Sequence, residues 1–236
     1  MDFVLRFIEI MGIISFSAAG AMIAIDKETD LFGVIILSGI TCFGGGLTRD
    51  IIVGDGLPAF FDMPVELTIS VATALVIFLA AAIFKNEYVR EEESVNKINN
   101  ILDALGIGVF TSVGTGMYIT QGPLVAIFAG TVTSVGGSLV RDIILREIPF
   151  ILKKRIYALA VIAGASLYYI FETFVFAGLE DSGVLSTVIC TAVIFTIRMC
   201  ATRFKWNMPK AIIFDKIRDS SDEDTVSAEA EKISSK

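Results

Sequence analysis

The sequence predicts an all-α polytopic membrane protein: seven transmembrane helices, arranged as an inverted 3+3 repeat plus a seventh helix. Three observations predict this fold class. The 236-residue chain is 54% hydrophobic and 19% charged, with a mean hydropathy of +0.74, well above that of water-soluble domains. Two halves of the chain carry the same motifs. Among the connections between apolar segments, Lys and Arg occur only in alternate ones.

The apolar segments define the expected helices. A hydrocarbon core about 30 Å thick requires roughly 20 residues of helix to cross it. The connections between such segments are short, apart from one charged stretch from Lys85 to Lys97. The expected spans are Phe3 to Ala24, Leu31 to Val53, Glu66 to Phe84, Ile98 to Ile119, Pro123 to Leu145, Tyr157 to Ala177 and Gly183 to Phe204.

The first and fourth spans resemble each other, and so do the second and fifth. Residues 8–13 read IEIMGI where residues 102–107 read LDALGI, and residues 41–52 read TCFGGGLTRDII where residues 133–144 read TSVGGSLVRDII. Since one copy contains an odd number of spans, the second copy enters the membrane from the opposite side, as in inverted-repeat transporters. We expect four parts: repeats at 1–90 and 91–178, the seventh helix at 179–204, and a polar, disordered tail at 205–236.

The orientation follows from the basic residues of the connections. Lys and Arg are enriched in cytoplasmic loops. The outer segments of the chosen orientation contain none, whereas the inner ones carry Lys27, Lys85, Arg90, Lys97, Arg146, Lys153, Lys154, Arg155, Arg203, Lys205 and Lys210. We therefore expect a multi-pass protein of the inner (plasma) membrane, with its N-terminus outside and its C-terminus in the cytoplasm.

Glycines interrupt the second and fifth spans at the same place. Three consecutive glycines cost about 3 kcal/mol of helix propensity relative to alanine, and a helix break in hydrocarbon needs protein or water to satisfy the freed backbone groups. We expect kinks that face the interior and line a pore or binding site; the alternative is close packing of small residues. The kink residues are Gly44, Gly45, Gly46, Gly136, Gly137 and Ser138, and the expected polar lining is Thr41, Thr48, Thr133 and Ser134.

Two Arg-Asp pairs follow the glycines, Arg49-Asp50 and Arg141-Asp142. An uncompensated charge inside a span costs about 3 kcal/mol or more, so these residues need partners. Adjacent helical residues point about 100° apart, so we expect each arginine to pair with the aspartate of the other repeat, or to cap carbonyls freed by the broken helix. Such pairs serve either as a structural lock or as contacts to an ion or substrate.

Other acidic and basic residues lie within the spans. Glu9 and Asp103 occupy equivalent positions of the two repeats. We expect them to pair with the motif arginines or to mark the two mouths of a pathway. Glu172 and Arg198 lie near span ends, where we expect their side chains to extend to the membrane surface.

The composition excludes several classes of function. The chain has no histidine, and its cysteines, Cys42, Cys190 and Cys200, lie within apolar segments. These facts exclude Ser-His and Cys-His catalysis, His-dependent metal sites and a disulfide framework. The net charge of -7 argues against nucleic acid. An aspartyl protease dyad is disfavoured because each candidate aspartate follows an arginine, which favours its ionised form. We expect no enzymatic activity, no cofactor and no metal site.

The doubled Gly-Gly-x-Leu-x-Arg-Asp-Ile-Ile pattern, the prolines that follow it (Pro58 and Pro149) and the three-plus-three-plus-one layout resemble the prokaryotic trimeric intracellular cation (TRIC) channel family, from about Phe3 to Phe204. Its repeated domain is also described as a bacterial glycine transporter domain. The resemblance implies a homotrimer with one pore per protomer, gated at glycine-kinked helices and passing potassium and other monovalent cations. Ser138 in place of a third glycine implies a weaker second kink. The lipid-binding Lys-Glu-Val motif of the animal branch has no counterpart here.

Two functions remain open. In a channel for a monovalent cation such as potassium, carbonyl and hydroxyl oxygens of the kinked helices replace the water around the ion. In a glycine transporter, a half-helix N-terminus would hold the substrate carboxylate, while Glu9 or Asp103 would bind its ammonium group. Both hypotheses use the same residues, and both place the protein among membrane lipid.

Overall fold

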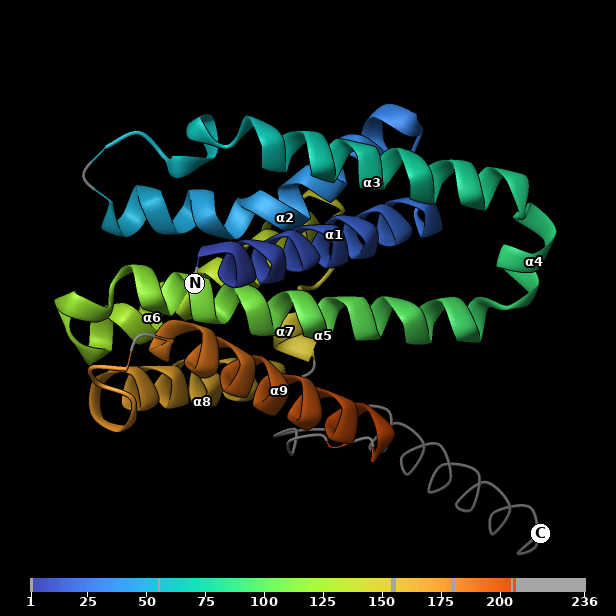
Figure 1. Ribbon diagram of the computed structural model, residues 1–236. Coiled ribbons are helices and arrows are strands. Elements are labelled where there is room, and N and C mark those ends of the chain that lie inside the picture. The colour runs from blue at the N-terminus through green and yellow to red at the C-terminus, as the bar shows by residue number, and fades with distance from the viewer. Residues whose placement is uncertain (1, 55, 154–155, 180, 205, 207–236) are drawn as a thin grey trace, which may run out of the picture. The chain divides into compact units, whose positions relative to one another are not determined.

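The computed structural model describes residues 2–54, 56–153, 156–179, 181–204 and 206, and all the regular secondary structure of these residues is helical (Figure 1). The expected polar tail, 205–236, lies outside the described residues except for Trp206. The long helices are α1 (Asp2–Asp26), α2 (Leu31–Val53), α3 (Pro64–Ile83), α5 (Glu92–Met117), α6 (Pro123–Ile144), α8 (Ile156–Ile170) and α9 (Ser182–Arg203). The short ones are η1 (Ala59–Asp62), α4 (Lys85–Arg90), η2 (Ile119–Gln121), α7 (Phe150–Lys153) and the π-helical turn η3 (Phe171–Val175).

Local sequence signals explain several helix starts. The side chain of Asp30 accepts a hydrogen bond from the backbone N–H of Gly33 at 2.8 Å and so caps the N-terminus of α2. Pro64 and Pro123 open α3 and α6, where a missing N–H costs no helical hydrogen bond. These signals fix where the spans begin.

Among the described residues, six helical segments are long and apolar enough to cross a membrane: α1, α2, α3, α6, α8 with η3, and α9. The expected fourth span falls within α5, a helix of 26 residues whose first turns carry charged and amide side chains. Six of the seven expected spans are therefore supported by length and composition. The crossing of α5 stays a prediction.

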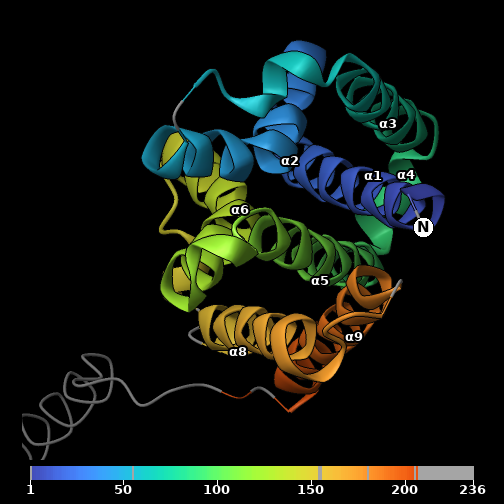
Figure 2. The same cartoon turned by 60° about the vertical axis from the view of Figure 1, so that its left-hand side comes forward.

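Helix α5 lies at the centre of the bundle, between α1 on one side and the α8–α9 pair on the other (Figure 2). It packs against α1, α6, α8 and α9. Its buried positions are mostly small: Ala104, Gly106, Gly108, Ser112 and Gly114. Small side chains at these positions let the neighbouring helices approach α5 closely.

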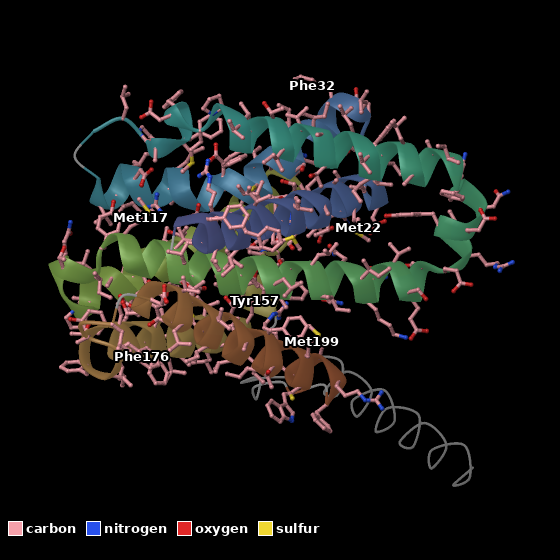
Figure 3. The ribbon with its side chains drawn as sticks, viewed as in Figure 1. Met22, Phe32, Met117, Tyr157, Phe176 and Met199 are labelled. Carbon is pink, nitrogen blue, oxygen red and sulfur yellow. The ribbon has the colours of Figure 1, made fainter. Side chains whose placement is uncertain are left out.

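The interior and the outer surface differ as expected for a membrane bundle. Tyr157 is 1% exposed and lies among the helices, whereas Phe32 is 71% exposed and points outward from α2 (Figure 3). Large apolar side chains are exposed on all the long helices, whereas many of the buried positions are Ala, Gly, Ser and Thr. This distribution matches a chain whose surroundings are hydrocarbon and whose helices approach each other closely.

The glycine-bearing spans are continuous helices, so the glycines do not break them, and the expected kinks stay a prediction. Both α2 and α6 are described over their whole length and stay helical through their glycines. Figures 1 and 2 show α2 changing direction near its middle without losing helical structure. The glycines allow backbone contact instead: a Cβ on Gly45 would overlap the carbonyl oxygen of Thr133, and one on Gly137 would overlap that of Thr41. Gly45 and Gly137 are therefore closely packed against the other helix.

Candidate functional site

Each arginine of the repeated motif binds the aspartate that follows it. Arg49 Nε donates to Asp50 Oδ1 at 2.7 Å, and Arg141 donates to Asp142 Oδ1 through Nε at 3.0 Å and Nη2 at 2.7 Å. All four residues are buried. The expected exchange of partners between repeats is wrong, because an arginine side chain is long enough to curl back to its neighbour although the two Cα–Cβ directions diverge.

The second oxygen of each aspartate holds the segment after the helix. Asp50 Oδ2 accepts from the backbone N–H of Ala59 at 2.9 Å, and Asp142 Oδ2 accepts from that of Phe150 at 2.8 Å. In the sequence, these N–H groups directly follow the repeated prolines. The motif therefore ties each helix end to the segment that follows it, in the same way in both repeats.

The two repeats meet where α2 crosses α6. The Cα of Gly137 faces Gly44, and that of Gly45 faces Gly136, so the helices touch backbone to backbone. A Cβ on Gly46 would lie 3.7 Å from Arg49 Nη2, an ordinary contact. The third glycine position is thus outside the crossing, which explains why the second repeat carries a serine there.

The hydroxyls expected to line a path bond mainly to their own helices. Thr41 and Thr133 donate to the carbonyls of Leu37 at 2.7 Å and Ala129 at 2.6 Å. Thr48 and Ser134 likewise bond to carbonyls within their helices. Thr133 also accepts from Arg49 Nη1 at 3.2 Å, which links the first motif to the second repeat.

A first cavity of about 80 Å³ adjoins the first motif. Its charged lining consists of Arg6, Glu9, Arg49, Asp50 and Glu66. Phenylalanine and methionine side chains complete its wall: Phe43, Phe60, Phe110, Met63 and Met117. Such a cavity has room for several water molecules.

Glu9 pairs with Arg6 at 3.6 Å rather than with a motif arginine. Arg6 also forms an ion pair with Glu66, which is 5% exposed. Our sequence reasoning missed Arg6 and Glu66. Two signals could have found them: the three-residue spacing of Arg6 and Glu9, and one carboxylate in the otherwise apolar α3.

A second cavity of about 40 Å³ adjoins the second motif. Its lining includes Asn99, Asp103, Ser138, Arg141 and Tyr157. Arg141 Nη1 and Asn99 Oδ1 are buried and have no hydrogen-bond partner among the described residues. One cavity thus contains an unsatisfied donor and an unsatisfied acceptor, which suits water or a small polar solute.

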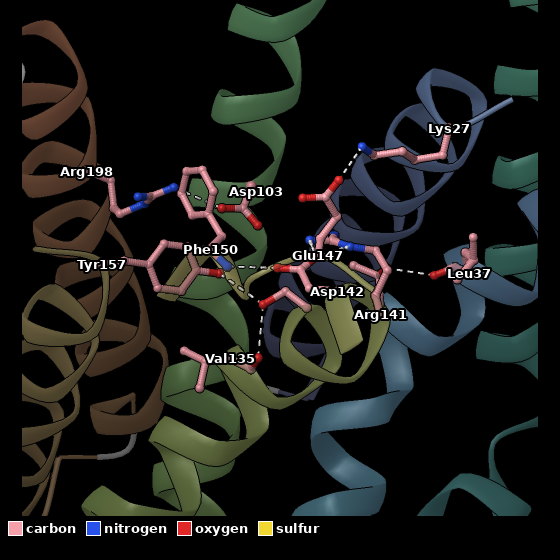
Figure 4. A network of polar contacts seen from close by, with 12 residues as sticks. Lys27, Leu37, Asp103, Val135, Arg141, Asp142, Glu147, Phe150, Tyr157 and Arg198 are labelled. Atoms are coloured by element: carbon pink, nitrogen blue, oxygen red, sulfur yellow. Dashed lines mark hydrogen bonds and ion pairs between the residues drawn. The ribbon is translucent and has the colours of Figure 1, made fainter. Parts of the chain in front are cut away.

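Arg198 enters this region from α9. Its Nη2 donates to Asp103 Oδ2 at 2.9 Å, and its guanidinium lies 4.3 Å from the ring centre of Tyr157 and 5.6 Å from that of Phe150 (Figure 4). The expectation that Arg198 extends to the membrane surface is wrong, because a carboxylate and two aromatic rings hold it inside. Asp103 therefore pairs with α9 and not with a motif arginine.

Glu172, the other residue expected at the membrane surface, is also bound within the protein. Its two carboxylate oxygens accept from the hydroxyls of Ser182 and Ser186, each at 2.8 Å. These bonds tie the π-helical turn η3 to the start of α9. The expected extension to the surface is therefore wrong here too.

The two cavities lie toward opposite ends of α1 and α5. Arg6 to Ile13 of α1 line the first cavity, whereas Ile23 lines the second. On α5 the order is reversed: Met117 lines the first cavity and Asn99 the second. One charged cavity thus lies toward each end of these two helices.

Outside the spans, Lys27 donates to Glu147 Oε1 at 2.7 Å and joins the loops after α1 and α6. This hydrogen bond and the carboxylate charge raise the pKa of Lys27 above its usual range. The ion pair links the two repeats at one end of the bundle.

Comparison with known proteins shows the family. A family model described as "Glycine transporter" matches residues 6–82 and 100–173, one match in each repeat. The chain is 31% identical over 209 residues to the UPF0126 inner membrane protein YadS of Escherichia coli K12, covering 86% of this chain and 93% of that protein. It belongs to the UPF0126 family. A UPF0126 membrane protein of Deinococcus radiodurans is 33% identical over 170 residues, 70% of this chain and 75% of that protein.

Solved structures agree with this UPF0126 assignment. A prokaryotic TRIC channel crystallised in 0.5 M KCl superposes with a TM-score of 0.74 at 25% identity, covering 88% of this chain and all of that one. The TRIC trimeric intracellular cation channel orthologue from Rhodobacter sphaeroides gives 0.73 at 26% identity, covering 86% and 99%. The resemblance to the prokaryotic TRIC family is confirmed. This UPF0126 protein is a membrane transport protein of the TRIC channel type.

Proposed function

We propose that the protein is a monovalent cation channel whose path runs within each protomer, from the first cavity past the α2–α6 crossing to the second. The observation that carries this proposal is the pair of repeat-related charged cavities at opposite ends of α1 and α5. Inverted repeats place permeation sites near their pseudo-twofold axis. The crossing lies between the two cavities, where such an axis is expected.

The charges of the cavities suit a weakly bound cation such as potassium. The first cavity contains three carboxylates, Glu9, Asp50 and Glu66, against two guanidinium groups. A small excess of negative charge attracts a cation, while the neighbouring arginines keep its binding weak. Conduction needs both properties, since an ion must enter the site and also leave it.

The α2–α6 crossing supplies the gate of this proposed channel. Gly44 lies against Gly137 and Gly45 against the backbone of Thr133, so no ion passes between the helices while they touch. Opening requires α2 and α6 to separate or bend at the glycines. The bend of α2 in Figures 1 and 2 supports a helix that adjusts at this level.

We further propose a homotrimer of the inner membrane with the N-terminus outside and the C-terminus in the cytoplasm. The trimeric TRIC orthologue supports the assembly, and the E. coli relative supports the membrane. The basic residues of alternate loops support the orientation.

A second candidate function is glycine transport. The first cavity presents both guanidinium and carboxylate groups, Arg6 and Arg49 beside Glu9 and Glu66, which match the two charges of an amino acid zwitterion. The family model carries the glycine transporter description. In this function, the two cavities would open alternately instead of together.

Reconstitution into liposomes separates the two functions. Potassium flux under an imposed voltage and uptake of labelled glycine are measured on the same preparation, with protein-free liposomes as the control. We expect potassium flux without glycine and no saturable glycine uptake. Saturable uptake without potassium flux would overturn the channel and establish the transporter.

A further inference from the structure

Glu9 and Asp103 occupy equivalent positions of the two repeats and each lines one cavity, but they pair with different arginines. Glu9 pairs with Arg6 of its own helix, and the side chain of Arg6 is 50% exposed. Asp103 pairs with Arg198, whose side chain is 3% exposed and belongs to α9, outside the repeat. The first pair faces an accessible region, whereas the second is enclosed.

Arg198 is held in a position that stability alone does not favour. Its guanidinium contacts Asp103 and the rings of Tyr157 and Phe150, while its Nε has no hydrogen-bond partner in the part of the chain that the structure describes. Buried ion pairs rarely stabilise a fold more than apolar packing does, and an unsatisfied buried donor adds a further cost. Such an arrangement indicates a role beyond packing.

Arg198 is the arginine that pairs directly with Asp103. Arg141 of α6 lines the same cavity, but its charge is neutralised by its ion pair with Asp142. Tyr157 connects Arg198 to the α2–α6 crossing. Its ring contacts Arg198, and its hydroxyl lies 3.4 Å from the Oγ of Ser138, which follows the crossing glycines of α6. Arg198 therefore occupies the place beside Asp103 that a passing cation would use.

We propose that Arg198 is a tethered cation that closes the second cavity, and that displacement of its side chain or of α9 opens it. This inference rests on the channel function proposed above. The guanidinium competes with potassium for Asp103, and its fixed positive charge in a region of low dielectric constant repels an incoming cation. The added seventh helix thereby regulates a pathway that the repeat alone builds.

The test is voltage-driven potassium flux of the full chain in liposomes. Arg198→Gln removes the tethered charge, and Arg203→Gln removes the same charge from an exposed position of the same helix. We expect Arg198→Gln to raise the flux about tenfold, the change given by a barrier lower by about 1.4 kcal/mol. Arg203→Gln should match the wild type, and Arg198→Lys, which keeps the positive charge, should raise the flux less than Arg198→Gln does. Asp103→Asn should not raise the flux, because the tethered cation remains.

A purely structural role predicts a different pattern, in which Arg198→Gln and Asp103→Asn lower the flux alike. If the Arg198→Gln variant does not fold, the double variant Arg198→Gln/Asp103→Asn is used instead, because it leaves neither member of this ion pair charged. Its potassium flux should still exceed that of the wild type. If the wild type conducts and Arg198→Gln conducts equally well, the proposal that Arg198 closes the second cavity is wrong, while the channel function stands. If neither the wild type nor any variant conducts, the proposed channel function is wrong. If only variants that lack the arginine conduct, Arg198 closes the wild-type pathway completely, as proposed.

Discussion

At the scale of single residues, each aspartate of the repeated motif forms two different interactions through its two carboxylate oxygens. In Asp50 and Asp142 one oxygen neutralises the preceding arginine, and the other accepts a backbone N–H from the next segment. An asparagine keeps the shape but loses the charge. Substitution therefore tests the ion pair while leaving most of the packing in place.

We expect Asp50→Asn and Asp142→Asn each to destabilise the protein by about 3 kcal/mol or more, because each leaves a buried arginine unpaired. Asp62→Asn is the control, since Asp62 is exposed on η1. The melting temperature in detergent measures the effect. Equal melting temperatures for Asp50→Asn and Asp62→Asn would show that the buried pair contributes nothing.

The crossing glycines give a second prediction at this scale. Gly45→Ala and Gly137→Ala place a Cβ on a carbonyl oxygen of the other helix, so α2 and α6 must move apart. We expect a lower melting temperature and altered potassium flux. Gly39→Ala is the control on α2, because nothing lies within 4 Å of its Cβ, and better helix propensity should keep or raise stability by up to about 1 kcal/mol. Gly46→Ser should also be tolerated. An unchanged Gly45→Ala variant would contradict the close crossing.

At the scale of elements, the sequence predicted the positions of the helices better than it predicted which buried charged side chains pair with each other. The expected second span, Leu31 to Val53, has the bounds of α2, since an N-cap and a terminal glycine mark its ends. The charged stretch after the third span was less predictable, because it forms α4 and the first turns of α5. Polar residues there reach solvent from a helix as readily as from a loop, so composition does not distinguish the two.

Partners of buried charges could not be predicted because they depend on side-chain conformation and on how helices outside the repeat pack. The repeat identified Arg49, Asp50 and Asp103 as interior charges, and all three are indeed interior. The partner of Asp103 is Arg198 of α9, which no repeat comparison contains. The motif arginines curl back to their neighbours, a side-chain conformation that helix geometry alone does not fix.

The first cavity gives a prediction for this scale, because α1 and α3 supply its carboxylates. Glu9→Gln and Glu66→Gln remove negative charge that concentrates cations at this end of the path. We expect each to lower potassium flux, more strongly at low than at high ionic strength, since salt screens the attraction. Glu28→Gln, exposed in the loop after α1, is the control. Flux that falls equally at all salt concentrations would indicate a structural effect.

At the scale of the whole molecule, the two repeats form one bundle around the α2–α6 crossing and α5. The ion pair of Lys27 with Glu147 joins their loops at one end, and the Glu147 carboxylate raises the pKa of Lys27 above its usual range. The family model matches both repeats and leaves α9 outside. Helix α5, whose composition gives the weakest support for a membrane crossing, packs against α1, α6, α8 and α9.

The topology of the chain depends on α5 alone. Its 26 residues extend about 39 Å, more than a hydrocarbon core requires, and it runs alongside α1 and α6 through the bundle. We therefore expect it to cross, which puts Asn86, before it, and Gln121, after it, on opposite sides. Single cysteines at these positions, in a full chain with Cys42, Cys190 and Cys200 replaced by serine, are labelled in intact cells with a membrane-impermeant maleimide. Labelling at Gln121 and not at Asn86 is expected for an external N-terminus. Equal labelling at both would mean that α5 does not cross, and the inverted repeat would fail with it.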